Sequence, residues 1–267
     1  MAENLKKSAT DKLAAKSDWP ELVRKIRART PARILEGRAG PAYRTETQLQ
    51  LREDHAAARD AVRAELDVNA AFGAEFIEKW KLFEVDTRAS SKDEYLQHPS
   101  LGRAFNDASR AEIARRCTSG CDVQIAIGDG LSVPAIGAQV PCLLPSLMEG
   151  AEARGWSVGQ AFIIHHCRVG IVNIIGDLLR PRIVLLLIGE RPGLATAESL
   201  SAYLAYQPDR THTDANRNLI SNIHRRGLSA EEAAARILNL CSQMMTLRVS
   251  GVTLKEIAGH DAESLPK

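Results

Sequence analysis

The feature that most constrains the fold of this chain is an unbroken aliphatic run at residues 183–188, which ends in the loop Gly-Glu-Arg-Pro-Gly at 189–193. Strands of an open parallel sheet are buried on both faces, so they lack the alternation of polar and apolar residues that a half-exposed strand has. The loops at the carboxyl ends of such strands form the crevice in which α/β proteins bind ligands. The run therefore predicts a central strand, and the loop after it predicts a binding site.

A strand, a turn and a helix follow one another earlier in the chain. Residues 122–128 have the composition of a strand and residues 129–132 that of a turn. A helix is expected to begin near Pro134, because a proline in the first turn of a helix lacks only an N–H that would have no partner there. Pro141 and Pro145 are expected to break or kink that helix.

Strands and helices continue to alternate toward the end of the chain. Residues 162–164 and 201–206 predict further strands, and residues 213–223 predict a helix. A capping box at 229–232 opens the last long helix. This alternation is typical of α/β proteins. We therefore predict an α/β fold: a Rossmann-like, doubly wound, mainly parallel sheet with an N-terminal helical annex.

The composition of the sequence and its predicted secondary structure divide the chain into four parts. Residues up to about 115 are charged and helix-prone, and the alternation of strands and helices starts after them. We predict a flexible or amphipathic N-terminal tail at 1–29, a helical N-terminal region at 30–115, a Rossmann-like domain at 116–255 and a C-terminal tail at 256–267.

Composition and charge narrow the classes of function. The chain has 267 residues, 45% of them apolar, and a formal net charge of +2, so no overall field attracts it to nucleic acid or to an anionic membrane. No run approaches the roughly 20 apolar residues of a membrane span, and no apolar leader segment is visible. Five cysteines without a CxxC pair are typical of reduced cytosolic thiols. These features predict a cytoplasmic protein with no nucleic-acid partner and no membrane partner.

Acidic side chains stand at the carboxyl ends of two predicted strands. Glu190 follows the aliphatic run, and Asp129 follows the strand at 122–128. Contact with a ligand explains either position, but so does a solvated loop, and for Glu190 so does an ion pair with Arg191. The residues alone leave these alternatives open.

Two other motifs are weaker signals of chemistry. Residues 128–132 are similar to a dinucleotide-binding turn, but the third glycine is missing and Pro134 removes one N–H from the anion site. Ser132 is predicted to cap the helix instead. His165 and His166 are adjacent at the end of a strand, where neighbouring side chains point to opposite faces. A structural role for each is therefore favoured over a shared metal or acid–base site.

Nine blocks of the sequence match one family in order and spacing, and together they extend from about Thr30 to Leu254. The blocks are Leu-Glu-Gly-Arg-Ala-Gly at 35–40, His-Ala-Ala-Ala-Arg-Asp-Ala-Val at 55–62, Tyr-Leu-Gln-His-Pro-Ser-Leu-Gly at 95–102, the strand and turn at 122–132, Cys-Arg-Val-Gly-Ile-Val-Asn-Ile-Ile-Gly at 167–176, Leu-Ile-Gly-Glu-Arg-Pro-Gly at 187–193, Glu-Ser-Leu-Ser-Ala-Tyr at 198–203, Ile-Ser-Asn-Ile-His at 220–224 and Ser-Gly-Val-Thr-Leu at 250–254. The chain resembles the small subunit of ethanolamine ammonia-lyase.

This resemblance implies an adenosylcobalamin-dependent lyase that converts ethanolamine to acetaldehyde and ammonia. In that family a large partner subunit, a TIM barrel, holds the substrate and most of the catalytic groups. The small subunit adds a Rossmann-like domain, here residues 116–255, to a cobalamin site at the interface of the two subunits. The resemblance therefore implies no catalytic residue on this chain, and it implies that the chain is inactive alone.

The family's cobalamin contacts fall at three positions of this sequence: Val169, Glu190 and Leu219. Relatives can carry Cys at the position of Leu219, and they tend to carry an acidic residue near Asn173. A role for a thiol at position 219, or for a negative charge near position 173, is therefore not expected in this chain. No Asp-x-His-x-x-Gly motif of base-off cobalamin proteins occurs, so the cofactor's own base is expected on cobalt.

Two other classes of function and one question of location stay open. A nucleotide-binding oxidoreductase subunit fits the glycine turn, and a non-catalytic assembly subunit fits the lack of a catalytic constellation.

Some members of the family enter a bacterial microcompartment. The tail, with Leu5, Ala9 and Leu13 at helical spacing, is a hypothetical address for it.

Overall fold

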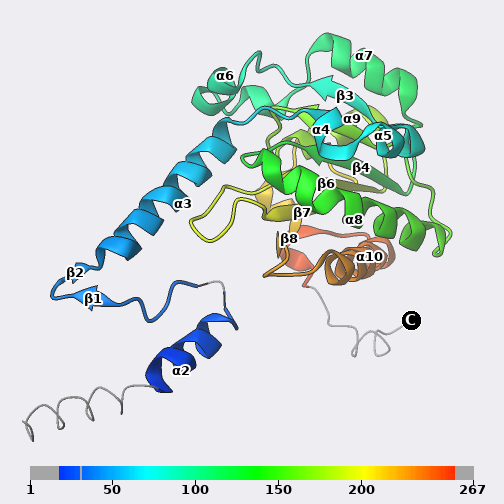
Figure 1. Cartoon of the computed structure of the whole chain (residues 1–267). Coiled ribbons are helices and arrows are strands. Elements are labelled where there is room, and N and C mark those ends of the chain that lie inside the picture. The colour runs from blue at the N-terminus through cyan, green and yellow to red at the C-terminus, as the bar shows by residue number, and fades with distance from the viewer. Residues whose placement is uncertain (1–17, 31, 256–267) are drawn as a thin grey trace, which may run out of the picture. The chain divides into compact units, whose positions relative to one another are not determined.

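The computed structural model describes residues 18–30 and 32–255, and it divides into two compact units, Met1–His55 and Ala56–Lys267 (Figure 1). The stripe Leu5, Ala9 and Leu13 and the tail at 256–267 lie outside the described residues. The four-part division of the chain stays a prediction. Within the described residues, no helix is long and apolar enough to cross a membrane.

The first unit is small and is held together by polar contacts. Its elements are helix α2 (Asp18–Arg27), the two-stranded hairpin β1 (Arg38–Ala39) and β2 (Ala42–Tyr43), and the first part of helix α3 (Thr45–Arg63). The side chain of Arg27 donates hydrogen bonds to the carbonyl oxygens of Ile34, at 2.9 Å, and Leu35, at 2.7 Å. Arg33 pairs with Asp54.

The second unit is built on one six-stranded sheet in the order β3-β5-β4-β6-β7-β8. The strands are β3 (Phe83–Asp86), β4 (Val123–Gly128), β5 (Phe162–His165), β6 (Ile183–Gly189), β7 (Leu200–Tyr206) and β8 (Asn218–Ile223). The first four in this spatial order are parallel, and β7 and β8 are antiparallel to their neighbours. The predicted mainly parallel α/β sheet is confirmed.

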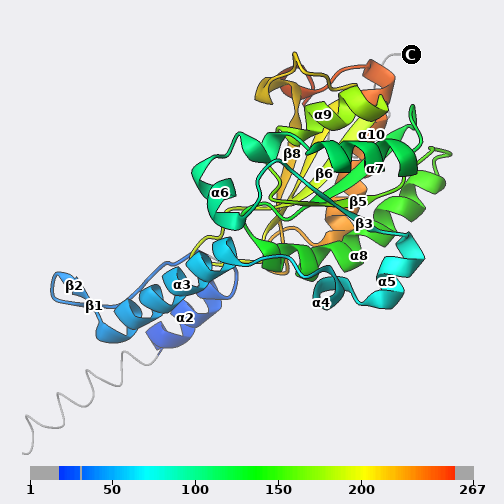
Figure 2. The same cartoon turned by 90° about the horizontal axis from the view of Figure 1, so that it is seen from above.

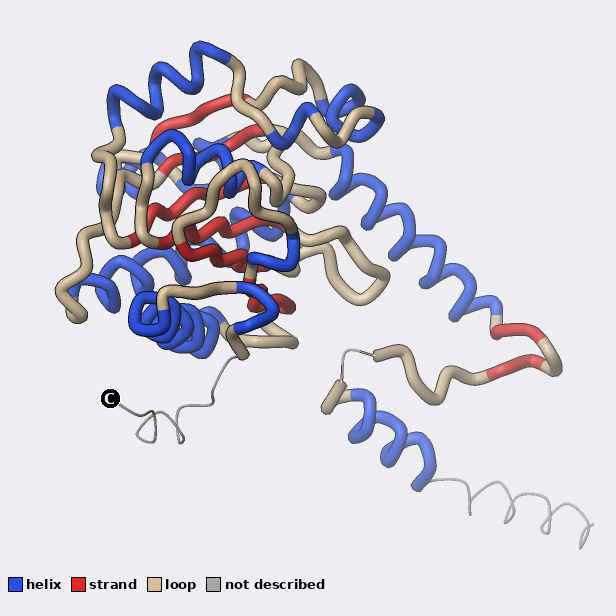
Figure 3. The backbone as a smooth tube through the Cα atoms, turned by 180° about the vertical axis from the view of Figure 1, so that it is seen from behind, coloured by secondary structure: helices blue, strands red, loops and turns tan. Residues whose placement is uncertain are grey.

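Helices cover both faces of this sheet (Figures 2 and 3). One face packs against α4 (Val68–Phe72), α5 (Ala74–Trp80), α8 (Val133–Glu152) and α10 (Ala230–Leu247), and the other against α7 (Asp107–Arg116) and α9 (Ile171–Leu179). The remaining helical elements are α6 (Lys92–Gln97) and the short 3₁₀ helices η1 (Leu101–Arg103), η2 (Asp214–Asn216) and η3 (Gly251–Thr253). The sheet is doubly wound, as predicted.

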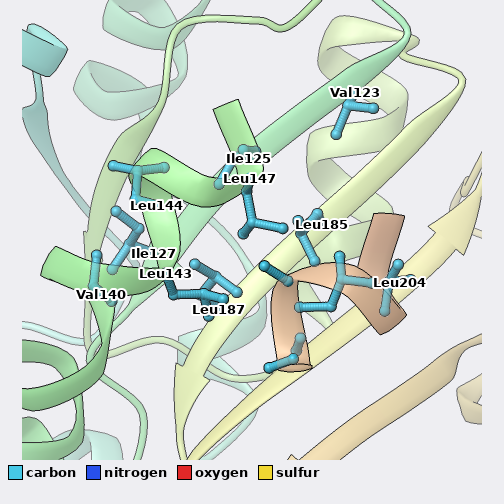
Figure 4. Close-up of a cluster of buried hydrophobic side chains, with 14 of the residues drawn as sticks. Val123, Ile125, Ile127, Val140, Leu143, Leu144, Leu147, Leu185, Leu187 and Leu204 are labelled. Carbon is cyan, nitrogen blue, oxygen red and sulfur yellow. The ribbon is translucent and has the colours of Figure 1, made fainter. Parts of the chain in front are cut away.

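The aliphatic run of β6 serves the apolar cores on both faces of the sheet. Ile183, Leu185 and Leu187 pack into the cluster beneath α8 and α10, part of which Figure 4 shows. Val184 and Leu186 pack into the cluster beneath α7 and α9. Every residue of β6 is buried, which is why no polar alternation interrupts its sequence.

Four strands differ from the expectation from sequence: β1, β2 and β3, which lie in the region predicted to be helical, and β8. No strand is predicted before residue 122, yet β3 pairs with β5 at the edge of the sheet. The prediction of a helix at 213–223 is wrong, because the short η2 is followed there by β8, in which Leu219 pairs with Tyr203 and Ile220 with Ala202. Strand β3 depends on a partner about 80 residues away, and β8 depends on pairing with the strand before it, so the local sequence pattern reveals neither strand.

Helix α8 runs through both of its internal prolines. Pro141 and Pro145 do not break the helix, because α8 continues to Glu152; a kink at either proline stays a prediction. Its buried face, which includes Leu143 and Leu144 at 0% exposure, packs on the central strands. Tertiary packing therefore stabilises the helix in spite of two missing backbone hydrogen bonds.

A buried carboxylate joins the carboxyl ends of β4 and β5. Asp129, which is 0% exposed, follows β4 and accepts hydrogen bonds from the backbone N–H groups of His166, at 2.9 Å, and Cys167, at 2.8 Å. The Lys92 ammonium lies 3.3 Å from the same carboxylate and is itself buried. Asp129 was a candidate for ligand contact, and the structure contradicts this, because its carboxylate is committed to these groups inside the protein.

Helix α6 and the 3₁₀ helix η1 support the same loop from the other side. The hydroxyl of Tyr95 donates a hydrogen bond to the carbonyl oxygen of Cys167 at 2.9 Å, and the N–H of Arg168 donates to the carbonyl oxygen of Gly102 at 2.8 Å. A Cβ atom at Gly102 would lie 2.5 Å from the carbonyl oxygen of His166, so only glycine allows this approach. The loop after β5 is therefore fixed on two sides.

Replacing Asp129 with Asn is expected to lower the free energy of unfolding by about 3–5 kcal/mol, because the variant leaves the Lys92 ammonium buried without a counter-charge. The measurement is chemical denaturation of the full chain. The matched control is Asp93→Asn, since Asp93 forms an exposed ion pair with Arg63. This control is expected to change the free energy of unfolding by less than about 1 kcal/mol. Equal effects of the two variants would contradict the structural role of Asp129.

Candidate functional site

A pocket of about 300 Å³ lies at the carboxyl ends of the parallel strands. The loops after β4, β5 and β6 line it, together with residues of β7 and β8. From β4 the chain crosses to β5 on one side, and from β5 it crosses back over β4 to β6 on the other side. Such a reversal of strand order is where doubly wound proteins bind their ligands.

The three positions predicted to contact cobalamin all line this one pocket. Val169 lies in the loop after β5, Glu190 follows β6, and Leu219 belongs to β8. Val169 is half-buried, whereas Leu219 exposes 48% of its surface and is among the large apolar residues that the protein leaves exposed. The fold therefore brings together three side chains from separate segments of the chain.

The carboxylate of Glu190 is held by three hydrogen-bond donors. One oxygen accepts from the hydroxyl of Ser201 at 2.6 Å and from the N–H of Asn222 at 2.9 Å, and the other accepts from the hydroxyl of Ser199 at 2.7 Å. A carboxylate offers about four lone-pair sites, so one site on the second oxygen stays available. Of the alternatives for Glu190, an ion pair with Arg191 does not occur among the described residues.

The partners of Glu190 are not among the residues predicted from the sequence to belong to the site. Ser199 and Ser201 are two residues apart, and this spacing places both side chains on one face of a strand. That signal was available in the sequence. Asn222 was assigned to a helix or its cap, whereas it lies in β8 with a positive φ of 59°. Its contact with Glu190 depends on the pairing of β7 with β8.

The loop after β4 is poorly suited to a dinucleotide phosphate. The N–H of Leu131 donates to the carbonyl oxygen of Gly189 at 3.1 Å, and the N–H of Asp129 donates to that of Ile164 at 3.2 Å. Both groups are therefore engaged in the sheet, and the buried carboxylate of Asp129 adds a negative charge beside them. Ser132 stands at the start of α8, but its hydroxyl donates to the carbonyl oxygen of Ala197 and caps no helix N–H.

The two adjacent histidines have separate partners. The ring of His165 lies 2.7 Å from a carboxylate oxygen of Glu84, and the ring of His166 lies 3.1 Å from one of Glu65. His166 is buried and contacts the carbonyl oxygen of Ala89 through its other ring nitrogen, at 3.2 Å. Both therefore have structural partners, and neither lines the pocket.

Two titratable groups in the lining of the pocket have raised pKa values. One is the thiol of Cys167, which is 0% exposed. Burial, with a contribution from the negative charge of Asp129, raises the pKa of this thiol well above its usual range. Burial and the charge of Glu190 also raise the pKa of the Tyr203 hydroxyl. Both groups are thus neutral near pH 7, which leaves the pocket with hydroxyls, a carboxylate, guanidinium groups and apolar surface.

Comparison with known proteins assigns the chain to a family. A model of the ethanolamine ammonia-lyase light chain matches residues 20–255, which is most of the chain. The small subunit of ethanolamine ammonia-lyase from Clostridium perfringens is 43% identical over 230 residues, which cover 86% of this chain and 76% of that protein.

Two further relatives carry the same name. The proteins from Clostridioides difficile and Listeria monocytogenes, both small subunits of ethanolamine ammonia-lyase, are 42% and 40% identical over 86% of this chain and over 76% and 77% of their own lengths. The resemblance seen in the sequence blocks is confirmed. The chain belongs to the ethanolamine ammonia-lyase light chain family.

Proposed function

We propose that this small subunit of an ethanolamine ammonia-lyase contributes the pocket around Glu190 to an adenosylcobalamin site that it shares with the large subunit. The enzyme then converts ethanolamine to acetaldehyde and ammonia. The observation that carries the proposal is the meeting of Val169, Glu190 and Leu219, from three segments, around one pocket. The family's cobalamin contacts were assigned to these residues from sequence alone.

The lining residues fit a corrinoid. The exposed side chain of Leu219 and the half-buried Val169 offer apolar surface to a macrocycle. The remaining acceptor site of Glu190 suits an amide N–H of a corrin side chain. The pocket holds about 300 Å³. This is at the lower end of the range of roughly 300–1,000 Å³ for sites of drug-sized ligands, and a cobalamin is larger than those ligands. The pocket therefore suits one part of the cofactor, and we propose that the large subunit surrounds the rest.

If the two subunits enclose different parts of the cofactor, they also have different tasks in the reaction. When bound, adenosylcobalamin supplies the radical chemistry that abstracts hydrogen from the substrate, and the protein positions and shields it. The task of this chain is to hold the corrin with a carboxylate that three donors have already oriented. Because the lining carries no acid–base pair, we assign ethanolamine to the large subunit.

We further propose that the cofactor keeps its own base on cobalt. No residue in the lining of the pocket is a histidine. His165 and His166, the histidines nearest to it in sequence, are paired with Glu84 and Glu65. Moving either ring to cobalt would break these pairs and, for His166, empty a buried position.

Location inside a bacterial microcompartment also stays a prediction. It depends on Leu5, Ala9 and Leu13, which lie outside the described residues.

The proposal is tested by producing the chain together with its large subunit and measuring release of ammonia from ethanolamine with and without adenosylcobalamin. Release is expected only when both subunits and the cofactor are present, because this chain holds part of the cofactor site and the large subunit holds the substrate. A complex that assembles but shows no cofactor dependence would identify a non-catalytic assembly subunit instead.

Glu190→Gln in the complex is expected to raise the Kd for cobalamin about 10-fold or more, since a neutral amide makes weaker hydrogen bonds than a carboxylate and cannot accept at both of its ends. Equilibrium dialysis measures the change. Glu198→Gln is the matched control, because Glu198 is an exposed residue of the same loop. A Kd that rises equally in both variants would remove Glu190 from the cofactor site.

The Co(II) form of the bound cofactor tests the identity of the axial base by electron paramagnetic resonance. The superhyperfine pattern is expected to stay the same when the histidines of the protein are labelled with ¹⁵N, because the nitrogen on cobalt belongs to the cofactor. A pattern that changes with the label would mean that a protein histidine has replaced it.

A further inference from the structure

The guanidinium of Arg168 has few hydrogen-bond partners within the part of the chain that the structure describes. Arg168 lies between Cys167 and Val169 in the loop after β5, and it is one of the residues that line the pocket. Sequence reasoning did not single it out. We propose that Arg168 binds the phosphodiester group of the cofactor's nucleotide loop. This inference rests on the proposed cobalamin site and adds a specific contact to it.

The position of the guanidinium is fixed by its surroundings. The backbone N–H of Arg168 is bonded to Gly102, and its guanidinium carbon lies 4.2 Å from the centre of the Tyr95 ring. Tyr95 is 0% exposed and is anchored by its hydroxyl to the carbonyl oxygen of Cys167. An arginine stacked on a buried ring loses little further freedom when it binds a ligand.

The hydrogen-bonding capacity of Arg168 is largely unused. A guanidinium has five N–H donors. Among the described residues, the side chain makes one long hydrogen bond, 3.5 Å from a terminal nitrogen to the carbonyl oxygen of Tyr95. Its Nε atom is buried and has no hydrogen-bond partner there, and no described carboxylate forms an ion pair with it. A partly buried cation in this state calls for an external acceptor.

Among the described residues, neither Asp129 nor Glu190 forms an ion pair with Arg168. Asp129 is bonded to Lys92 and to two backbone N–H groups. Glu190 accepts hydrogen bonds from Ser199, Ser201 and Asn222, and its one remaining acceptor site is the one proposed to receive a corrin amide. An acceptor that comes with a ligand or from the large subunit would satisfy these unused donors.

A phosphodiester fits this position better than an amide carbonyl of the corrin. Two oxygens of a phosphate match the fork of a guanidinium, and the negative charge balances the cation. An amide oxygen would accept a hydrogen bond but leave the charge uncompensated. A cobalamin carries its phosphodiester in the loop that links the corrin to its base, and cobinamide lacks that loop.

The experiment compares the Kd of the two-subunit complex for hydroxocobalamin and for diaquocobinamide. Arg168→Met is expected to raise the Kd for hydroxocobalamin by about 10- to 100-fold, because a charge-assisted hydrogen bond is lost. The same variant is expected to change the Kd for cobinamide by less than about 3-fold, because cobinamide has no phosphodiester. Arg168→Lys, which keeps the charge but not the fork, is expected to lie between. Arg180→Met, at an exposed arginine after α9, is the matched control and is expected to bind both ligands as the unchanged complex does.

A second measurement does not depend on the affinity for cobinamide. The ³¹P resonance of cobalamin bound at saturation is expected to shift between the unchanged complex and Arg168→Met, and to stay in place in Arg180→Met. A ³¹P resonance that is the same in Arg168→Met as in the unchanged complex would overturn the phosphate contact. So would an equal rise of the Kd for hydroxocobalamin and for cobinamide. Either result would leave the proposed cobalamin site intact. Failure of Arg168→Met to assemble, with assembly restored by Arg168→Lys, would overturn it in favour of an acidic group of the large subunit. Failure of the unchanged complex to bind any corrinoid would instead refute the proposed function.

Discussion

The buried carboxylate of Asp129 ties together the parts of the chain that build the pocket. It joins the end of β4 to the loop after β5 through two backbone hydrogen bonds, and it draws in Lys92 from α6. That loop carries Arg168 and Val169, and α6 carries Tyr95, on which the guanidinium is stacked. One wall of the pocket therefore depends on an ionic contact that is buried inside the protein.

The opposite wall depends on the pairing of three strands. Glu190 ends the parallel strand β6, and its partners come from the antiparallel strands β7 and β8. Neither wall has a nucleophile beside a base, and the buried thiol of Cys167 is held neutral. The two walls therefore offer an oriented carboxylate, neutral hydroxyl and thiol groups and apolar surface, which are the features on which the proposed cofactor site rests. Membership of a light-chain family agrees with this proposal.

The parts of the fold that could be predicted are those that depend on residues close together in the sequence. The aliphatic run of β6 predicts its burial, and the position of Glu190 at the end of that run predicts a place at the ligand-binding edge. By contrast, β8 has too few apolar residues in alternation to be recognised, because an edge strand has one neighbour in the sheet and exposes Leu219.

The parts that could not be predicted depend on contacts between distant residues. The contact of Arg168 with the carbonyl oxygen of Tyr95 spans 73 residues, and that of Glu190 with Asn222 spans 32. Asp129 has the same place after a strand as Glu190, yet Lys92 from α6 turns it into a structural group. No spacing rule distinguishes these two carboxylates, since their roles depend on which residues the fold brings beside them.

The most direct test of a shared cofactor site is a structure of the two-subunit complex with adenosylcobalamin, determined by cryo-electron microscopy. We expect the corrin at the interface, with one of its side-chain amides within hydrogen-bond distance of the Glu190 carboxylate and with Val169 and Leu219 against the macrocycle. A cofactor enclosed by the large subunit alone, with these three residues in contact only with protein or solvent, would contradict the account.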